Sequence, residues 1–212
     1  KYILEDIPVV LAKANQALQT LEKYKEGLDD LSFNLTVREL EDLATLFDVC
    51  SVLQRSSIVQ KTEKEVKKYI YELGADGRLL SMQTEELMAN VASDFMDIVS
   101  DYKHPDNKLD ADQIREKANS LTADELLDLS RIAGLIGYKP EGNLKEINLQ
   151  PRGFRILSDV RRLPQSIIVN LIEKFGNLKS ILDADVDQLS EVTGMGKTRA
   201  RSIYNRLKKY SE

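Results

Sequence analysis

Several residue types needed for disulfide, metal or membrane chemistry are scarce in this 212-residue sequence. One cysteine, Cys50, and one histidine, His104, exclude an internal disulfide and a zinc site built from cysteine and histidine. A Cys–His catalytic pair stays open in principle. However, Cys50 falls at an apolar helical position typical of a buried thiol, and His104 precedes Pro105 in a polar loop. No apolar run approaches the roughly 20 residues that span a bilayer, so no membrane partner is expected.

The amino-terminal residues also lack the features of a targeting segment. KYILEDIPVV has neither the basic region nor the apolar core of a signal peptide. Together with the single cysteine, this favours a cytoplasmic location. The sequence begins at Lys1 rather than Met, which is compatible with a piece of a longer protein.

Charge is divided unevenly along the chain, although the formal net charge is only −5. Residues 1–150 carry 18 Lys and Arg against 28 Asp and Glu, a net charge of −10. Residues 151–212 carry 12 Lys and Arg against 7 Asp and Glu, a net charge of +5. An acidic body with a basic carboxy-terminal part predicts that a polyanionic partner binds at the carboxy-terminal end.

Strand patterns are nearly absent, and helical periodicity predicts an all-α fold with an elongated helical bundle, or spine, over residues 6–140. Residues 1–5 are expected to be a short extended segment, the remaining strand of a domain that is absent from this sequence. Residues 141–150 have turn residues and little periodicity, which predicts a linker. One helix is expected to start near Asp6 and Pro8, with an apolar seam at Ile7, Leu11, Ala14, Leu18, Leu21 and Leu28.

Capping patterns divide the rest of the spine. Thr36 with Glu39 predicts the start of a second helix, which Gly74 can end. A third helix is expected over residues 79–101. Two shorter helices follow a polar loop, the second starting at Thr122 with Glu125. Paired carboxylates such as Glu85 and Glu86 fall in turns or first helical turns, where the helix dipole accounts for them without catalysis.

An internal repeat organises residues 151–212. With a shift of 32 residues, LSDVRRLPQSIIVNLIEKF (157–175) aligns with LSEVTGMGKTRARSIYNRL (189–207), and the apolar positions coincide. Each copy reads as a helix, a tight hairpin and a second helix. A repeat of this kind predicts two similar motifs packed around one core.

The second copy resembles the helix-hairpin-helix DNA-binding family, through Leu-x-x-Val-x-Gly-apolar-Gly-x-x-x-Ala-x-x-Ile-x-x-x-Leu. Gly194 and Gly196 allow a sharp turn and a close approach of phosphate, and Met195 is expected to point inward. Backbone N–H groups at the hairpin and at the following helix would face the anion. The predicted DNA-binding residues here are Thr193, Gly194, Met195, Gly196, Lys197, Thr198, Arg199 and Arg201, with Lys197 and Arg201 on one helical face and Arg199 and Arg206 on an adjacent one.

The first copy departs from that pattern, because Arg162 and Pro164 replace the two glycines. Pro164 has no N–H to donate, so a backbone clamp on phosphate is doubtful here. Two alternatives stay open: Arg161 and Arg162 bind DNA through their side chains, or the hairpin serves only for packing.

The segment GMGKT also contains Gly-Lys-Thr, the end of a nucleotide-binding phosphate loop. That motif needs a glycine at position 191, where the sequence has Glu191, and it should follow a buried strand rather than the short helical segment DVDQLSEV. The spacing therefore excludes a nucleotide-binding phosphate loop. It favours a hairpin whose ligand is a phosphate of a DNA strand.

With the carboxy-terminal motif placed, four further segments resemble the DisA family of DNA integrity scanning proteins. They are LAKANQALQTLEKYKEGLDDLSFNL, LATLFDVCSVLQRS, GRLLSMQTEELMANV and PRGFRILSDVRRLP. The resemblance implies a diadenylate cyclase domain, a helical spine and a helix-hairpin-helix domain, in that order. The cyclase motifs Asp-Gly-Ala and Arg-His-Arg do not occur here: Asp76-Gly77 is followed by Arg78, and His104 lies in KHP.

The resemblance thus implies a spine and a DNA-binding domain without the cyclase, with residues 1–5 as the last strand of the absent domain. ATP and magnesium would belong to that absent domain, so no cofactor is expected in this chain. The implied partner is branched DNA, such as junctions and forks, in the bacterial nucleoid. DNA contact would regulate synthesis of cyclic di-AMP in the intact protein. The alternative is a structural or oligomerisation scaffold that self-associates through the spine.

Overall fold

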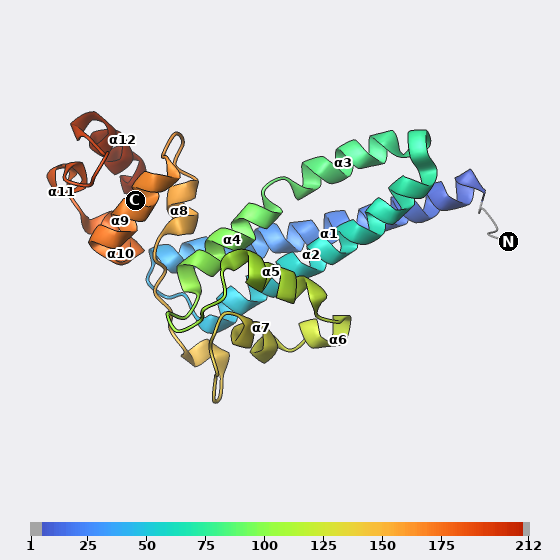
Figure 1. Cartoon of the computed structure of the whole chain (residues 1–212), viewed down its shortest axis with the longest axis horizontal. Helices are drawn as coiled ribbons and strands as arrows, with labels where there is room; N and C mark the ends of the chain where they lie inside the picture. The colour runs from blue at the N-terminus through green and yellow to red at the C-terminus, as the bar shows by residue number, and fades with distance from the viewer. Residues whose placement is uncertain (1–5, 210–212) are drawn as a thin grey trace.

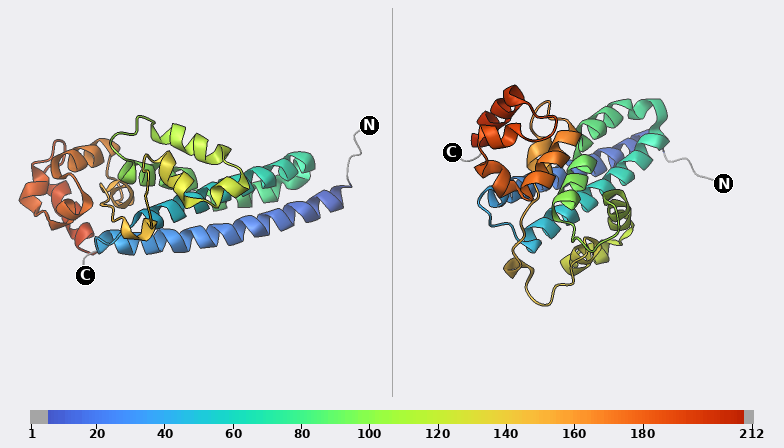
Figure 2. Two further views of the ribbon diagram at one scale, coloured as in Figure 1. Left: turned by 90° about the horizontal axis from the view of Figure 1, so that it is seen from below. Right: turned by 60° about the vertical axis from the view of Figure 1, so that its left-hand side comes forward.

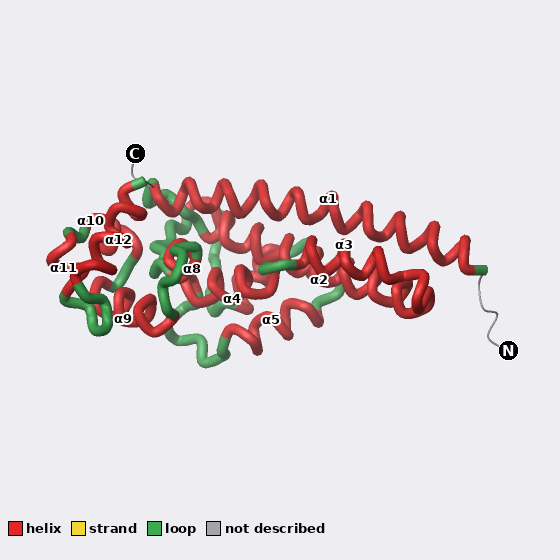
Figure 3. Tube along the Cα trace, turned by 90° about the horizontal axis from the view of Figure 1, so that it is seen from above, coloured by secondary structure: helices red, strands yellow, loops and turns green. Residues whose placement is uncertain are grey.

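The computed structural model describes residues 6–209 and shows an elongated, entirely helical molecule (Figure 1). Two long antiparallel helices, α1 (Ile7–Leu40) and α2 (Leu46–Leu73), form the spine, and a smaller helical unit lies at one end of it. In Figure 2, α1 extends along nearly the whole spine. Residues 6–209 contain no β-strand, as the tube in Figure 3 shows. The predicted all-α class is confirmed, whereas the strand expected at residues 1–5 lies outside the described residues.

The amino-terminal helix buries one narrow seam, and the predicted seam was wrong at its start. Ala14, Leu18, Leu21 and Leu28 are buried as expected, and Val10 and Leu35 join them. Ile7 is 54 % exposed and Leu11 is 37 % exposed, because Val10, one position away from Leu11, takes the inward place in the first turns.

The predicted helix start at Thr36 is wrong. Helix α1 continues through this residue, whose hydroxyl donates a hydrogen bond to the carbonyl of Ser32 (2.9 Å). The second helix starts instead after Thr45, where Thr45 and Asp48 form the capping box. Thr36 and Glu39 have the spacing of a capping box, but both side chains are used in contacts with Arg155.

Other predicted boundaries vary in accuracy. Gly74 ends α2 with φ +56°, and Thr122 with Glu125 caps α6 (Ala123–Leu126), as predicted. The expected single helix over 79–101 is two helices, α3 (Arg78–Met88) and α4 (Val91–Tyr102), because Asn90 adopts a left-handed conformation (φ +70°) between them.

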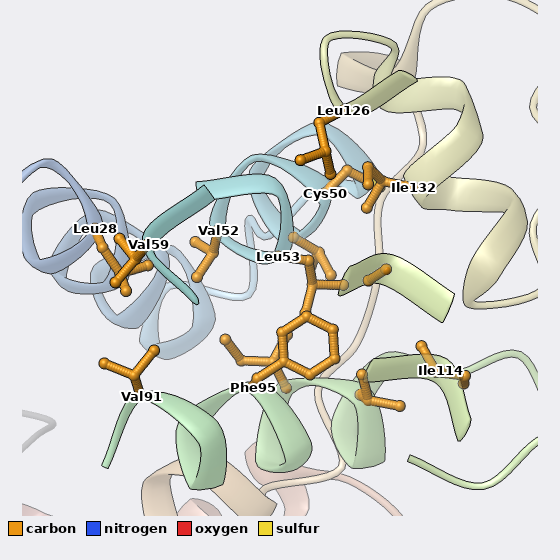
Figure 4. Close-up of a cluster of buried hydrophobic side chains, with 14 of the residues drawn as sticks. Leu28, Cys50, Val52, Leu53, Val59, Val91, Phe95, Ile114, Leu126 and Ile132 are labelled. Carbon is orange, nitrogen blue, oxygen red and sulfur yellow. The ribbon is translucent and has the colours of Figure 1, made fainter. Parts of the chain in front are cut away.

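Three shorter elements complete the spine and close its core. Helices α5 (Ala111–Ser120), α6 and α7 (Leu129–Leu135) pack beside α2. In Figure 4, Leu126 and Ile132 lie close to Cys50 of α2, whereas the ring of Phe95 in α4 lies against Leu53 of α2. Cys50 lies in this core with no exposed surface, and burial raises the pKa of its thiol to about 12. The thiol is therefore protonated and structural at neutral pH.

Residues 141–150 pack against the spine. Leu144 in the short 3₁₀ helix η2 (Leu144–Glu146) is buried, and the backbone N–H groups of Leu46 and Leu149 donate to Ile147 and Ala44 (both 2.8 Å). We propose a division of the chain into a spine (6–140), a linker (141–150) and a carboxy-terminal domain (151–212).

The carboxy-terminal unit has its own hydrophobic core, built from the two copies of the repeat. The first copy contains α8 (Phe154–Ser158) and α9 (Gln165–Phe175), and the second contains α11 (Val186–Ser190) and α12 (Lys197–Lys208). Helix α10 (Leu178–Asp183) connects them. Side chains from both copies, among them Leu157, Leu171, Leu189 and Ile203, share one core, as the repeat predicted.

Buried polar groups fix the carboxy-terminal unit to the spine. The guanidinium of Arg155 donates to both carboxylate oxygens of Glu39, whose side chain is fully buried, and Tyr102 donates its hydroxyl to the same carboxylate (2.7 Å). Asp101 accepts the N–H groups of Gly153 (2.6 Å), Phe154 (2.6 Å) and Arg155 (3.0 Å). Burial raises the pKa of Asp101 to about 7, and the three N–H donors oppose that rise because they favour the carboxylate.

Candidate nucleic-acid interface

The second hairpin, residues 193–196, joins α11 to α12 in a conformation that favours glycine at position 194 and requires it at position 196. Gly194 has φ +81°, and Gly196 has φ +65° with ψ 151°, a region that residues with a Cβ scarcely occupy. The N–H of Met195 donates to the carbonyl of Val192 (2.9 Å), which closes the turn. Met195 is only 2 % exposed and packs into the core, so its predicted inward position is confirmed.

Backbone donors collect at this hairpin. Within residues 6–209, the N–H groups of Gly196, Lys197 and Thr198 have no hydrogen-bond acceptor, and the first bond of α12 runs from Ala200 to Gly196 (3.0 Å). A Cβ added to Gly196 would meet no atom within 4 Å, so the space in front of it is open. Free N–H groups at the start of a 12-residue helix can donate to an anion such as phosphate.

The first hairpin, residues 161–164, repeats the turn but not its donors. The N–H of Leu163 donates to Val160 (3.1 Å), and Arg162 takes the place of Gly194 with φ +62°. Pro164 takes the place of Gly196 with φ −63° and offers no N–H. This hairpin can therefore contact an anion mainly through the side chains of Arg161 and Arg162.

The fold brings the two hairpins to one cavity of about 580 Å³, here called the hairpin cleft. Five cationic side chains line it: Arg161 and Arg162 from the first copy, and Lys197, Arg199 and Arg206 from the second. Gly194, Met195, Gly196 and Thr198 also line it. Thr193 and Arg201 do not, although the sequence placed them among the DNA-binding residues. The cleft joins nearly all predicted residues into one basic surface.

The position of Arg201 follows from the orientation of α12. The helix turns Arg199, Ser202 and Arg206 toward the cleft, which leaves Arg201 exposed outside it. The sequence had grouped Lys197 with Arg201 and had not included Ser202. Residues three or four positions apart share one face of a helix, so the spacing of Arg199, Ser202 and Arg206 could have indicated the face of α12 that lines the cleft.

Two side chains brace the second hairpin, and the sequence did not indicate the first of them. The amide of Asn170 in α9 donates to the carbonyl of Thr193 (3.0 Å), and Arg199 donates to the carbonyl of Gly194 (2.8 Å). Lys174, one turn after Asn170, reaches Glu191 (2.8 Å) and the carbonyl of Gln188 (3.0 Å). Helix α9 of the first copy thereby positions the hairpin of the second.

Replacing Asn170 by alanine is expected to weaken DNA binding about two- to tenfold, because the loss of one hydrogen bond of about 0.5–1.5 kcal/mol loosens the hairpin. Asn205→Ala is the matched control, since Asn205 is exposed on α12 and its side chain makes no hydrogen bond within residues 6–209. Fluorescence anisotropy with labelled duplex DNA measures both. Equal affinities of the two variants would contradict the bracing role.

The rest of the described chain offers little competing chemistry. Within residues 6–209, no group of three or more His, Cys, Asp or Glu side chains is placed to hold a metal ion. Over the same residues, none of the helices combines the length and apolar character that crossing a membrane requires.

Comparison with known proteins agrees with this architecture. A family described as the DisA bacterial checkpoint controller linker region matches residues 4–145, and one described as a SAM-like helix-hairpin-helix tandem matches residues 154–209. Two similar proteins are the DNA integrity scanning protein DisA of Acetivibrio thermocellus, 46 % identical, and that of Carboxydothermus hydrogenoformans, 43 % identical, each over 212 residues. The matches cover this whole chain but only 59 % and 60 % of those relatives.

Proposed function

This chain belongs to the DisA family, and on that premise we propose that it binds branched DNA, such as junctions and forks, through the hairpin cleft. The convergence of five cations with free backbone N–H groups at one cleft carries the proposal. Phosphate contacts of this kind read the shape and position of strands rather than base sequence. Two hairpins of different chemistry, one donating through backbone and one through arginines, suit a substrate whose strands diverge.

A second part of the proposal concerns a full-length protein of the same length as the relatives, which are longer than this chain. We propose that DNA binding at this cleft regulates cyclic di-AMP synthesis by a cyclase domain, with ATP and magnesium bound there. This chain, which lacks the motifs Asp-Gly-Ala and Arg-His-Arg, would itself turn over no ATP. The proposed location is the bacterial nucleoid.

A salt titration tests the binding mode. If the cleft neutralises about four phosphates, the log–log slope of affinity against salt concentration should be about −3 to −4. Affinity for a four-way junction and a fork should exceed that for a linear duplex of equal length. A slope near zero, or no binding to any of the three DNAs, would reject the DNA-binding role, and equal affinities would reject the preference for branches.

Self-association through the spine is a second candidate, favoured by apolar side chains at the end remote from the hairpins. Tyr71, Leu79 and Met82 are 88 %, 68 % and 59 % exposed in α2 and α3. Sedimentation velocity should detect a concentration-dependent dimer that Leu79→Asp abolishes. A monomer at all concentrations would leave the spine as an intramolecular support only.

A further inference from the structure

A second cavity lies on the spine, with no residue in common with the hairpin cleft. It has a volume of about 630 Å³, within the range of sites that hold small ligands. The loop between α4 and α5 forms one wall, α5 contributes Lys117, and the end of α7 with the turn after it forms the other wall. We call it the spine cavity.

The walls of the spine cavity are held together by specific contacts. The N–H of His104 donates to the carbonyl of Ile136 (2.9 Å), and the amide of Asn107 donates to Leu135 (2.8 Å). Gly137, with φ +97°, permits this approach, since a Cβ there would lie 2.9 Å from the Cβ of Asn107. The hydroxyl of Tyr138 donates to the carbonyl of Tyr102 (2.9 Å). These contacts hold the walls of the cavity in place, and the exposed side chains of its lysines are added to that preformed frame.

The charge of the spine cavity is opposite to that of its surroundings. Three lysines, Lys108, Lys117 and Lys139, line it, although residues 1–150 carry a net charge of −10. Within residues 6–209, none of these three ammonium groups makes a hydrogen bond or an ion pair. Asp106 is the one carboxylate of the lining, and its side chain is 93 % exposed. Three lysines around one concave site raise the positive potential there.

His104 adds a directed donor to the lysines. Its Nδ1 accepts the N–H of Asp106 (3.2 Å), which in the neutral ring leaves the proton on Nε2. The ring packs edge-on against Tyr138, with 5.3 Å between the ring centroids, and its Nδ1 also lies 3.6 Å from a carboxylate oxygen of Asp106. Three ammonium groups and one ring N–H form a donor set with the charge and hydrogen-bonding character that a phosphate group requires.

We propose that the spine cavity binds a phosphate group through Lys108, Lys117 and Lys139, at a site separate from the hairpin cleft. The phosphate comes either from a second arm of a bound DNA or from a free phosphorylated small molecule. The two sources present the same chemistry to the lysines. A small molecule could bind this site without any DNA at the hairpins, whereas a second DNA arm as the source rests on the proposed function.

The test compares two triple variants with equal loss of charge. Lys108→Ala/Lys117→Ala/Lys139→Ala removes the cavity lysines. Lys23→Ala/Lys64→Ala/Lys68→Ala removes three exposed lysines of α1 and α2, which have no hydrogen bond or ion pair within residues 6–209. Backbone amide spectra by NMR verify that both variants fold, and they separate shifts at residues 104–139 from shifts at residues 194–198.

Pyrophosphate is the small-molecule probe and a four-way DNA junction is the polymer probe. Saturable pyrophosphate shifts near His104 and Gly137, weakened at least about tenfold in the cavity variant only, support the site with a small molecule as source. A junction affinity at least about threefold lower in the cavity variant than in the control supports the site with DNA as source. No saturable pyrophosphate shift, together with equal junction affinities of both variants in a protein that binds the junction, overturns the proposal. Loss of junction binding in the control and the cavity variant alike would instead contradict the proposed function.

Discussion

Replacing Gly196 by valine is expected to lower affinity for DNA about 10- to 100-fold. The φ of +65° and ψ of 151° at this position are costly for any residue with a Cβ, by about 1–3 kcal/mol, and more so for a β-branched one. The hairpin can relieve this strain only by turning its backbone away. The N–H groups of Gly196 and Lys197 then no longer point at one phosphate, and each hydrogen bond to a charged group is worth about 1.5–3 kcal/mol.

Gly142→Val provides a control with comparable backbone strain. Gly142 has φ +110°, and an added Cβ would meet no atom within 4 Å, but it lies in the segment that packs on the spine. Its DNA affinity should equal that of the unchanged chain. Anisotropy titrations measure affinity, and amide spectra verify that the core around Met195 is retained. A folded Gly196→Val variant with unchanged affinity would refute the backbone clamp.

Replacing Glu39 by alanine is expected to destabilise the junction between the spine and the carboxy-terminal unit by about 3–5 kcal/mol, because the buried guanidinium of Arg155 loses its counter-charge. Tyr102 loses its acceptor in the same change. Calorimetry should show a melting temperature lower by about 6–20 °C for a chain of this length. Because each unit has its own core, the transition is expected to broaden or split as the two units unfold separately.

Glu41→Ala is the matched control, since Glu41 follows two residues later, is exposed and makes no side-chain hydrogen bond within residues 6–209. It should change the melting temperature by at most about 1–2 °C. Glu39→Leu combined with Arg155→Met should recover part of the loss, because an apolar pair removes the unpaired buried charge. A Glu39→Ala variant as stable as the Glu41→Ala variant would show that the ion pair does not hold the junction.

Local patterns identified the parts of this protein that local chemistry dictates. The glycines of the second hairpin, the inward Met195 and the caps at Gly74 and Thr122 depend on residues a few positions apart, so they could be predicted from the sequence. The repeat could be predicted as well, because its apolar positions match at a constant separation of 32 residues. The same logic failed where a distant partner competes for a local pattern. Thr36 and Glu39 have capping-box spacing, yet they bind Arg155, which lies 116 residues beyond Glu39 in the chain.

The sequence by itself determined an all-helical chain with an acidic body, a basic carboxy-terminal part and one hairpin that requires glycine. Only the tertiary structure decided that both hairpins line one cleft, and that Arg206 faces this cleft while Arg201 does not. It also decided that Asn170 supports the second hairpin through a hydrogen bond. Periodicity fixes which face of a helix is apolar, but not how that helix is oriented against the others. Packing of two repeat copies around a shared core sets that orientation, and with it the cations that meet.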